Sequence, residues 1–113
     1  MKEIKAYIKQ HKLSEVTLAL HQVEGLSGMS VLDARGFGRG RAKDSPDRIT
    51  EELVGFIPCV RLEITCSDDL VDPVIATIQQ AAHTGLRGDG KIYVSPVEAA
   101  VRISTGEQGE AAI

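Results

Sequence analysis

A chain of 113 residues with 42% hydrophobic side chains is long enough for one compact domain around one core. A net charge of -3, with lysine and arginine scattered along the chain, argues against nucleic acid as a partner. No apolar run reaches the roughly 18 residues of a membrane span, and the charged start is unlike a signal peptide. We therefore expect a cytoplasmic protein without direct membrane insertion.

The first third of the chain predicts two strands around a helix. Residues 2–9 alternate between apolar and charged side chains, which is typical of a strand with one buried face. Ser14 is a suitable N-cap for a helix that runs to about Val23, and Gly25 can end it in the left-handed conformation. A second strand follows at residues 29–37.

The rest of the chain predicts a long loop, two more strands and a second helix. Residues 40–55 show neither strand nor strong helix periodicity, and a loop of that length in a small domain is usually functional or disordered. Residues 60–66 alternate cleanly as a third strand. Residues 67–69 are expected to cap a helix that stops near Gly85, and residues 91–95 form the fourth strand.

The predicted order is β-α-β, a long loop, and β-α-β again. It indicates an α+β fold, a ferredoxin-like β-α-β-β-α-β sandwich. In such a fold both helices cover one face of a four-stranded sheet, and the other, partly apolar face needs a partner. We therefore expect homo-oligomerisation.

Two glycine-rich turns, at residues 36–40 and 85–91, are the candidate binding elements. Their glycines allow backbone N–H groups to surround a phosphate, and the neighbouring Arg39, Arg87 and Lys91 can neutralise its charge. Neither turn has the spacing of a Walker loop or of the dinucleotide-binding fingerprint. Two structural turns at strand ends are therefore the alternative interpretation.

The cysteines and histidines form no metal-binding motif. Cys59 and Cys66 are an odd number of residues apart on one predicted strand, so their side chains lie on opposite faces and we do not expect them to pair. No histidine stands at ligand spacing from another histidine or a cysteine. We assign no metal ligand and no catalytic residue, and we expect a protein that is not an enzyme.

Over nearly its whole length the chain resembles the PII signal-transduction family, the nitrogen regulatory proteins P-II. The matching segments, in order, are MKEIKAYIK, KLSEVTLAL, GMSVLDARGFGRG, FIPCVRLEI, DDLVDPVIATI, HTGLRGDGKIYV and VRISTGEQGEAAI. The resemblance implies a single domain, 1–113, in a homotrimer that binds ATP or ADP in the clefts between subunits, with or without Mg2+. It implies a T-loop at about 38–56, a B-loop at about 84–91 and a C-loop at about 102–110.

The resemblance also implies which residues bind the nucleotide. They are Ser30, Gly36, Phe37, Gly38, Arg39, Glu63, Thr65, Arg87, Gly88, Asp89, Gly90, Lys91 and Arg102. In the family, Ser30, Glu63 and Thr65 correspond to adenosine contacts, and the two glycine turns correspond to the T-loop base and the phosphate-binding B-loop. Arg102 would reach in from the adjacent subunit. Ser104 replaces a second arginine of the C-loop, a contact that Arg87 or Arg41 could supply.

Two departures from the family pattern concern 2-oxoglutarate, which the family holds through magnesium on ATP. Gly40 stands in place of a glutamine and Cys59 in place of a lysine. Loss of the charged partner removes ~1.5–3 kcal/mol, so we expect 2-oxoglutarate to bind weakly or not at all. There is also no tyrosine between residues 38 and 58, so the uridylylation of a T-loop tyrosine seen in some members is excluded.

The function that the resemblance implies is regulation of a partner protein. The nucleotide sets the conformation of the T-loop, and one conformation fits the target better. The rewritten loop sequence GRAKDSPDRITEELVG suggests a different target from the family's ammonium transporters and nitrogen enzymes, with another membrane transporter as one class. Two alternatives stay open: a metal-responsive regulator linked to heavy-metal efflux, using Cys59, and a slow ATP hydrolase using Asp89 and Lys91.

Overall fold

The computed structural model describes residues 1–38 and 56–113. Most of the expected T-loop, about 38–56, lies outside them. The elements in chain order are β1 (Lys2–Ile8), the 3₁₀ helix η1 (Gln10–Lys12), α1 (Leu13–His21), β2 (Ser30–Gly36), β3 (Ile57–Cys66), the 3₁₀ helix η3 (Asp68–Leu70), α3 (Val71–Ala82), β4 (Lys91–Pro96) and the 3₁₀ helix η4 (Gly109–Ala112).

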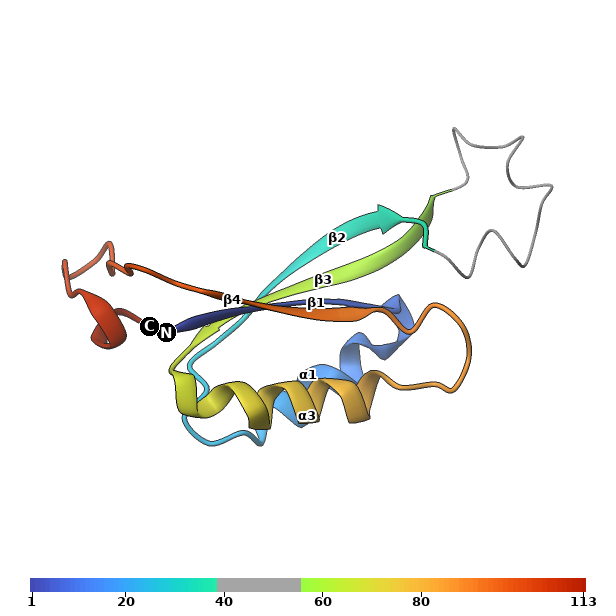
Figure 1. Ribbon diagram of the computed structural model, residues 1–113, viewed down its shortest axis with the longest axis horizontal. Coiled ribbons are helices and arrows are strands. Elements are labelled where there is room, and N and C mark those ends of the chain that lie inside the picture. Colours follow the sequence, from blue (N-terminus) through green and yellow to red (C-terminus); the bar gives the residue numbers. More distant parts are fainter. Residues whose placement is uncertain (39–55) are drawn as a thin grey trace.

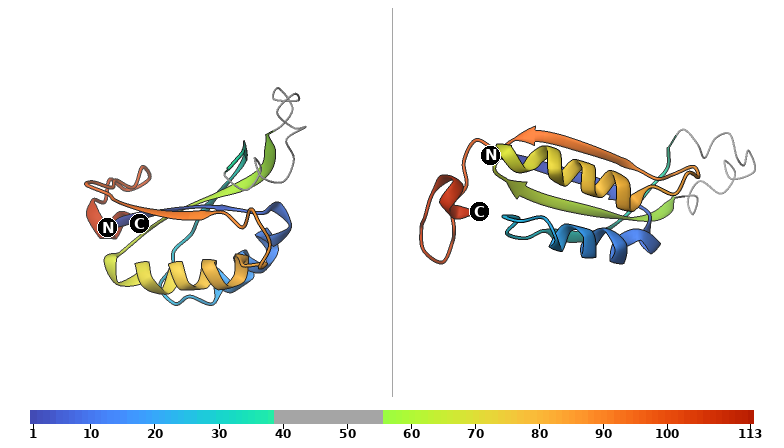
Figure 2. Two further views of the ribbon diagram at one scale, coloured as in Figure 1. Left: turned by 45° about the vertical axis from the view of Figure 1, so that its right-hand side comes forward. Right: turned by 90° about the horizontal axis from the view of Figure 1, so that it is seen from below.

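The four strands form one antiparallel sheet in the order β2-β3-β1-β4. The two halves of the chain interleave in this order, because β1 pairs with both β3 and β4. Both helices lie against the same face of the sheet, and the opposite face is left open in the single chain (Figure 1, Figure 2). The predicted α+β, ferredoxin-like sandwich is confirmed.

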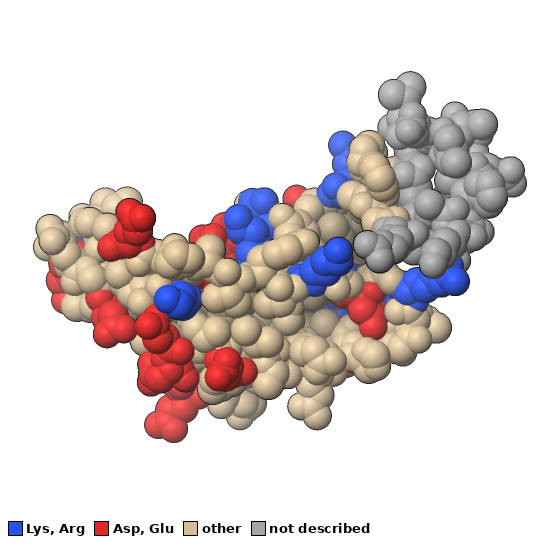
Figure 3. All heavy atoms as spheres, viewed as in Figure 1, with Lys and Arg blue, Asp and Glu red and all other residues tan. Residues whose placement is uncertain are grey.

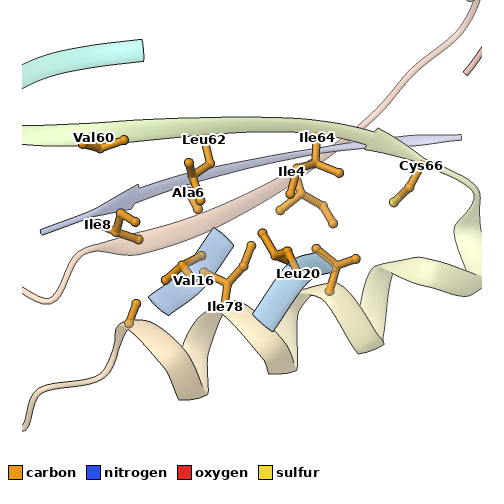
Figure 4. Packing of buried hydrophobic residues seen from close by; sticks show 12 residues of the cluster. Ile4, Ala6, Ile8, Val16, Leu20, Val60, Leu62, Ile64, Cys66 and Ile78 are labelled. Atoms are coloured by element: carbon orange, nitrogen blue, oxygen red, sulfur yellow. The ribbon is translucent and has the colours of Figure 1, made fainter. Parts of the chain in front are cut away.

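The hydrophobic core lies between the sheet and the two helices (Figure 4). It consists of Ile4, Ala6, Ile8, Val16, Leu20, Val60, Leu62, Ile64, Cys66, Val74, Ile78 and Ala82. Each fully buried isoleucine, leucine or valine contributes roughly 1.5–3 kcal/mol to stability relative to an exposed one. No polar or charged residue of the described ranges is buried. The alternation in β1 and β3 that predicted these strands therefore also fixes which face meets the helices.

The first helix begins differently from the sequence prediction. The 3₁₀ helix η1 runs directly into α1, so the N-cap position is Lys12 and no side chain caps it. Ser14 is the second residue of α1 and exposed, which corrects its assignment as N-cap. The turn of η1 explains the difference, because the backbone N–H of Leu13 donates to the Gln10 carbonyl instead of to a side chain. Gly25 has the predicted left-handed conformation, with a φ of 87°, but it does not end the helix, because α1 ends at His21 with Gln22 as its C-cap.

The second helix also starts through a 3₁₀ turn. Ser67 precedes η3, but its hydroxyl donates to Asp69 Oδ1 at 2.5 Å and does not cap the helix. Asp68 Oδ1 accepts from the N-terminal ammonium group at 2.9 Å, and this contact lowers the pKa of the Asp68 carboxyl group. The expected side-chain caps at 67–69 are therefore wrong, since these side chains are used in other contacts.

The open face of the sheet combines charged and aromatic side chains. The rings of Tyr7 and Tyr93 meet edge to face, with centroids 6.2 Å apart. Arg61 Nε lies 3.3 Å from Glu63 Oε2, although this buried nitrogen is not aligned for a hydrogen bond. A hydrogen bond with Tyr7 raises the pKa of Arg61, and Glu63 acts in the same direction. This face is only partly apolar, as expected.

Candidate functional site

The loop that joins α3 to β4 is built around the carboxylate of Asp89. The backbone N–H of Thr84 donates to Asp89 Oδ2 at 2.9 Å, and that of Gly85 donates to the same oxygen at 3.4 Å. The Thr84 hydroxyl donates to Asp89 Oδ1, and the N–H of Leu86 donates to Thr84 Oγ1 at 3.0 Å. These bonds close residues 84–89 into a ring that holds its own shape.

Lys9 ties this ring to the end of β1. Its Nζ donates to Thr84 Oγ1 at 3.1 Å and lies 3.3 Å from Asp89 Oδ1. His83 Nδ1, at the end of α3, lies 3.3 Å from Asp89 Oδ2 and forms an ion pair when it is protonated. We call Lys9, Thr84 and Asp89 the loop anchor.

The charge of Asp89 is stabilised strongly by its surroundings. The hydrogen bonds from the Thr84 hydroxyl and backbone, followed by the contact with Lys9, hold the pKa of this carboxyl group far below its usual range. Both carboxylate oxygens accept contacts from within the loop or from Lys9 and His83. Asp89 would have to leave these contacts before it could act as the base of an ATP hydrolase.

The glycines of this loop have a structural reason of their own. Gly85, Gly88 and Gly90 all adopt positive φ, which side chains rarely tolerate. Gly90 also lies against β1, where a β-carbon would come within 1.7 Å of the Tyr7 carbonyl oxygen. The pattern that suggested a phosphate cradle is therefore also required by the fold of the loop.

The second glycine turn lies at the end of β2. Gly36 is the last residue of β2 and pairs with Ile57. The Phe37 and Phe56 rings pack with centroids 5.4 Å apart, so they bring together the two ends of the segment between them. Gly38 is exposed, and the predicted site residue Arg39 lies outside the described ranges.

The three residues predicted to contact adenosine lie close together on the sheet. Ser30 pairs with Glu63 in the β2–β3 ladder, and Thr65 is the next residue of β3 on that face. All three lie on the open face, away from the helices. Lys91 pairs with Tyr7 on the same face, but at the opposite end, beside the glycine loop.

Arg102 lies in the segment that follows β4, far from the glycine loop of its own chain. The length of β4, ~17 Å at the antiparallel rise per residue, separates Lys91 from that segment. Figure 1 shows the loop between α3 and β4 and the segment after β4 at opposite ends of the molecule. Arg102 Nε lies 3.6 Å from Glu107 Oε1, and Arg102 Nη2 donates to the Ala111 carbonyl at 3.5 Å. One chain therefore does not bring the predicted site residues together.

The described residues offer no metal centre. Cys59 is half-buried on the open face and Cys66 is buried in the core, so the prediction that they lie on opposite faces is confirmed. In residues 1–38 and 56–113 no three His, Cys, Asp or Glu side chains gather in a way that could hold a metal ion. No helix in these ranges is long and apolar enough to cross a membrane.

Two residues of the loop anchor were missed by sequence reasoning. In the sequence, Lys9 is the charged last residue of the first predicted strand, and Thr84 lies at the end of the second predicted helix. Lys9 and Thr84 are 75 residues apart, so no local pattern links them. Thr84 and Asp89 are five apart, and a hydroxyl and a carboxylate at either end of a glycine turn were the only available signal.

Charge is unevenly distributed over the molecule. In the view of Figure 3, acidic side chains gather mostly at the end near the two termini, and basic ones extend along the sheet toward the other end. The glycine loop lies at this second end (Figure 1). A phosphate group is therefore favoured electrostatically at the end that carries the loop.

Comparison with known proteins gives the same family along the whole chain. The model of the family described as nitrogen regulatory protein P-II matches residues 1–107. The chain is 52% identical to the nitrogen regulatory protein P-II of Azospirillum brasilense, and 50% identical to those of Rhodospirillum rubrum and Bradyrhizobium diazoefficiens. Each comparison spans 113 residues and 100% of both chains. The chain therefore belongs to the nitrogen regulatory protein P-II family, whose members are signalling regulators and not enzymes.

Proposed function

We propose that this chain forms a homotrimer that binds ATP or ADP in clefts between subunits and controls a partner protein through residues 38–56. The observation that carries the proposal is the loop of residues 84–89, which is closed by its own hydrogen bonds and leads through Gly90 directly into Lys91. A loop that is already ordered loses little conformational entropy when it binds a phosphate. Nucleotide binding is therefore the role that fits this loop best.

The hydrogen bonds of the loop suggest which groups would meet the phosphates. The N–H groups of Thr84, Gly85 and Leu86 are used inside the loop. We expect the phosphates to be bound by the later backbone N–H groups, 88–91, and by the exposed ammonium group of Lys91. Asp89 then acts by shaping the loop.

The position of Arg102 supports a site made by two chains. It lies at the opposite end of β4 from the loop, so it can serve a phosphate only on a neighbouring subunit. The segment around it is held by its own hydrogen bonds, with Gly106 N donating to the Arg102 carbonyl at 2.8 Å. Two apolar residues of this segment are nevertheless exposed to solvent, Val101 at 61% and Ile103 at 101% of their accessible surface. Apolar side chains held outward in this way suit a surface covered by a second copy.

The output of this regulator is the interaction of the T-loop with a target protein. Phe37 and Phe56 pack together at the two ends of the segment 39–55, and Phe37 is itself one of the residues that we expect to bind the nucleotide. Nucleotide binding at Phe37 would then act on the start of the T-loop. A membrane transporter remains the partner class suggested by the family resemblance, and the cytoplasm is the expected compartment. Gly40 and Cys59 stand where the family has the glutamine and the lysine that hold 2-oxoglutarate, so we expect little response to this ligand.

Isothermal titration calorimetry with ATP, ADP and AMP tests this function. We expect ATP and ADP to bind with enthalpies that depend on the phosphate chain, and AMP to bind far more weakly. Repeating the ATP titration with Mg2+ and 2-oxoglutarate should change the affinity little. Absence of binding by all three nucleotides would contradict the proposed function.

A further inference from the structure

Lys9 contacts the glycine loop through both its ammonium group and its hydrocarbon chain. Its side chain is only 21% exposed, and that of Asp89 is 25% exposed, so the contact between them is partly shielded from water. Lys9 Cε also lies 3.7 Å from the point where a β-carbon on Gly88 would stand. Lys9 thus packs against the loop at Gly88, after Thr84, Gly85 and Leu86, whose N–H groups are bonded within the loop.

Resting on the proposed function, we propose that Lys9 is a positioning residue for the nucleotide phosphates. Its ammonium group joins the Thr84 hydroxyl to the Asp89 carboxylate, and these two groups orient the N–H groups of the loop. The loop anchor would hold the later N–H groups in the direction that a phosphate requires. Two of the three donors of Lys9 Nζ face oxygens of the loop, so the role that its geometry supports is to hold the loop in place.

Removal of Lys9 should loosen the loop without unfolding it. The bonds from the N–H groups of Thr84 and Gly85 to Asp89 do not involve Lys9 and would remain. Thr84 Oγ1 would lose one of its two donors and keep the Leu86 N–H, so the loop would sample more conformations before a ligand binds. The cost of ordering it would then be subtracted from the binding free energy.

The chain offers a matched control in Lys12. Lys12 Nζ lies 3.1 Å from Glu15 Oε2, and its side chain is 17% exposed, so the lysine is about as shielded as Lys9. Its partner Glu15 is 61% exposed and belongs to α1, not to the glycine loop. Lys12→Met therefore removes the same charge and a more exposed ion pair without altering the loop anchor.

The test combines two conservative pairs of variants with two measurements. Lys9→Met removes the ammonium group and Lys9→Arg keeps a donor and the charge, whereas Thr84→Val removes the hydroxyl and Thr84→Ser keeps it. Titration calorimetry with ADP gives the affinity. Amide hydrogen exchange in the nucleotide-free protein reports on the order of the loop at Thr84, Gly85 and Leu86.

We expect Lys9→Met and Thr84→Val each to weaken ADP binding roughly five- to twentyfold, as for a lost hydrogen bond in a partly shielded site. Lys9→Arg and Thr84→Ser should recover most of this loss, and Lys12→Met should stay within about twofold of wild type. Exchange at the three loop amides should rise in the first two variants only. Because both changes break one anchor, the double variant Lys9→Met with Thr84→Val should bind about as well as either single variant.

Three outcomes would overturn the inference. Unchanged ADP affinity in Lys9→Met, with faster exchange, would mean that the anchor orders a loop on which binding does not depend. Fully additive losses in the double variant would indicate that Lys9 contacts the nucleotide directly. If the wild type binds no nucleotide at all, the proposed function fails and this inference fails with it, whereas either of the first two results leaves the proposed function standing.

Discussion

The backbone of Gly90 approaches the carbonyl group of Tyr7 so closely that a β-carbon on residue 90 would lie 1.7 Å from the oxygen. The same β-carbon would lie 2.7 Å from the carbonyl carbon of Tyr7, so both atoms that it would clash with belong to the backbone. Gly90 also has a φ of 104°, a conformation open mainly to glycine. The loop can therefore reach β4 over the end of β1 only with glycine at this position.

Gly90→Ala should destabilise the protein strongly. Gly85→Ala is the matched control, because Gly85 lies in the same loop with a φ of 80° but has nothing within 4 Å of the point where a β-carbon would stand. We expect Gly90→Ala to cost about 1–3 kcal/mol more than the control, through the forced displacement of β1 or the loop. Urea unfolding of both variants measures the difference. Equal costs would mean that the strand and loop separate easily.

Acidification should weaken the loop through Asp89. Its pKa is depressed in the folded protein, so its contribution to stability is present above the unfolded pKa of about 3.9 and declines as pH falls toward the folded value. The difference in free energy of unfolding between wild type and Asp89→Ala should therefore shrink as pH falls below about 4. Lys9 and His83 are the charged or titratable partners that face Asp89, and protonation of His83 adds an ion pair that can only increase the difference above about pH 4. A difference that grows as pH falls below about 4 would contradict the geometry of the anchor.

Lys91→Ala should weaken ATP and ADP binding by ~1.5–3 kcal/mol, as expected when a charge-assisted phosphate contact is truncated. Lys91 is exposed at the start of β4, so the fold should tolerate the change. Lys12→Ala serves as the control for the general loss of a positive charge. Calorimetry that finds equal affinity in Lys91→Ala and wild type would place the phosphates elsewhere.

Light scattering at micromolar concentration should give the mass of a trimer. Ile103→Asp should shift the mass toward the monomer, because this fully exposed side chain would meet a neighbour with an uncompensated charge. Leu18→Asp, at a leucine of α1 that is 68% exposed, should leave the mass unchanged. A monomeric wild type would contradict the trimer, and a trimeric Ile103→Asp would place the contact elsewhere in the chain.

2-Oxoglutarate should bind weakly or not at all in the presence of ATP and Mg2+. Cys59 offers no cation to a carboxylate, and Gly40, which lies outside the described residues, offers no side-chain oxygen to magnesium. The double variant Gly40→Gln with Cys59→Lys should gain affinity for 2-oxoglutarate in calorimetric titrations. Low-micromolar affinity in the wild type would show that other residues bind the dicarboxylate.

The sequence by itself determined the strands, their buried faces and the family. Alternation with a period of two residues is a local property, and it correctly placed Ile4, Ala6 and Ile8 against the helices. The same parity correctly separated Cys59 from Cys66. Matching segments along the whole chain were enough for the PII resemblance, which the family comparison confirms. The nucleotide site and the trimer stay predictions.

Only the tertiary structure decided how the helices begin and what holds the glycine loop. Ser14 and Ser67 have suitable side chains for caps, but a 3₁₀ turn precedes each helix and takes over the first backbone contacts. The anchor of Asp89 depends on Lys9, and the need for glycine at residue 90 depends on the backbone of β1. These contacts join residues more than 70 positions apart, and such pairs become neighbours only once the sheet has brought β1 beside β4.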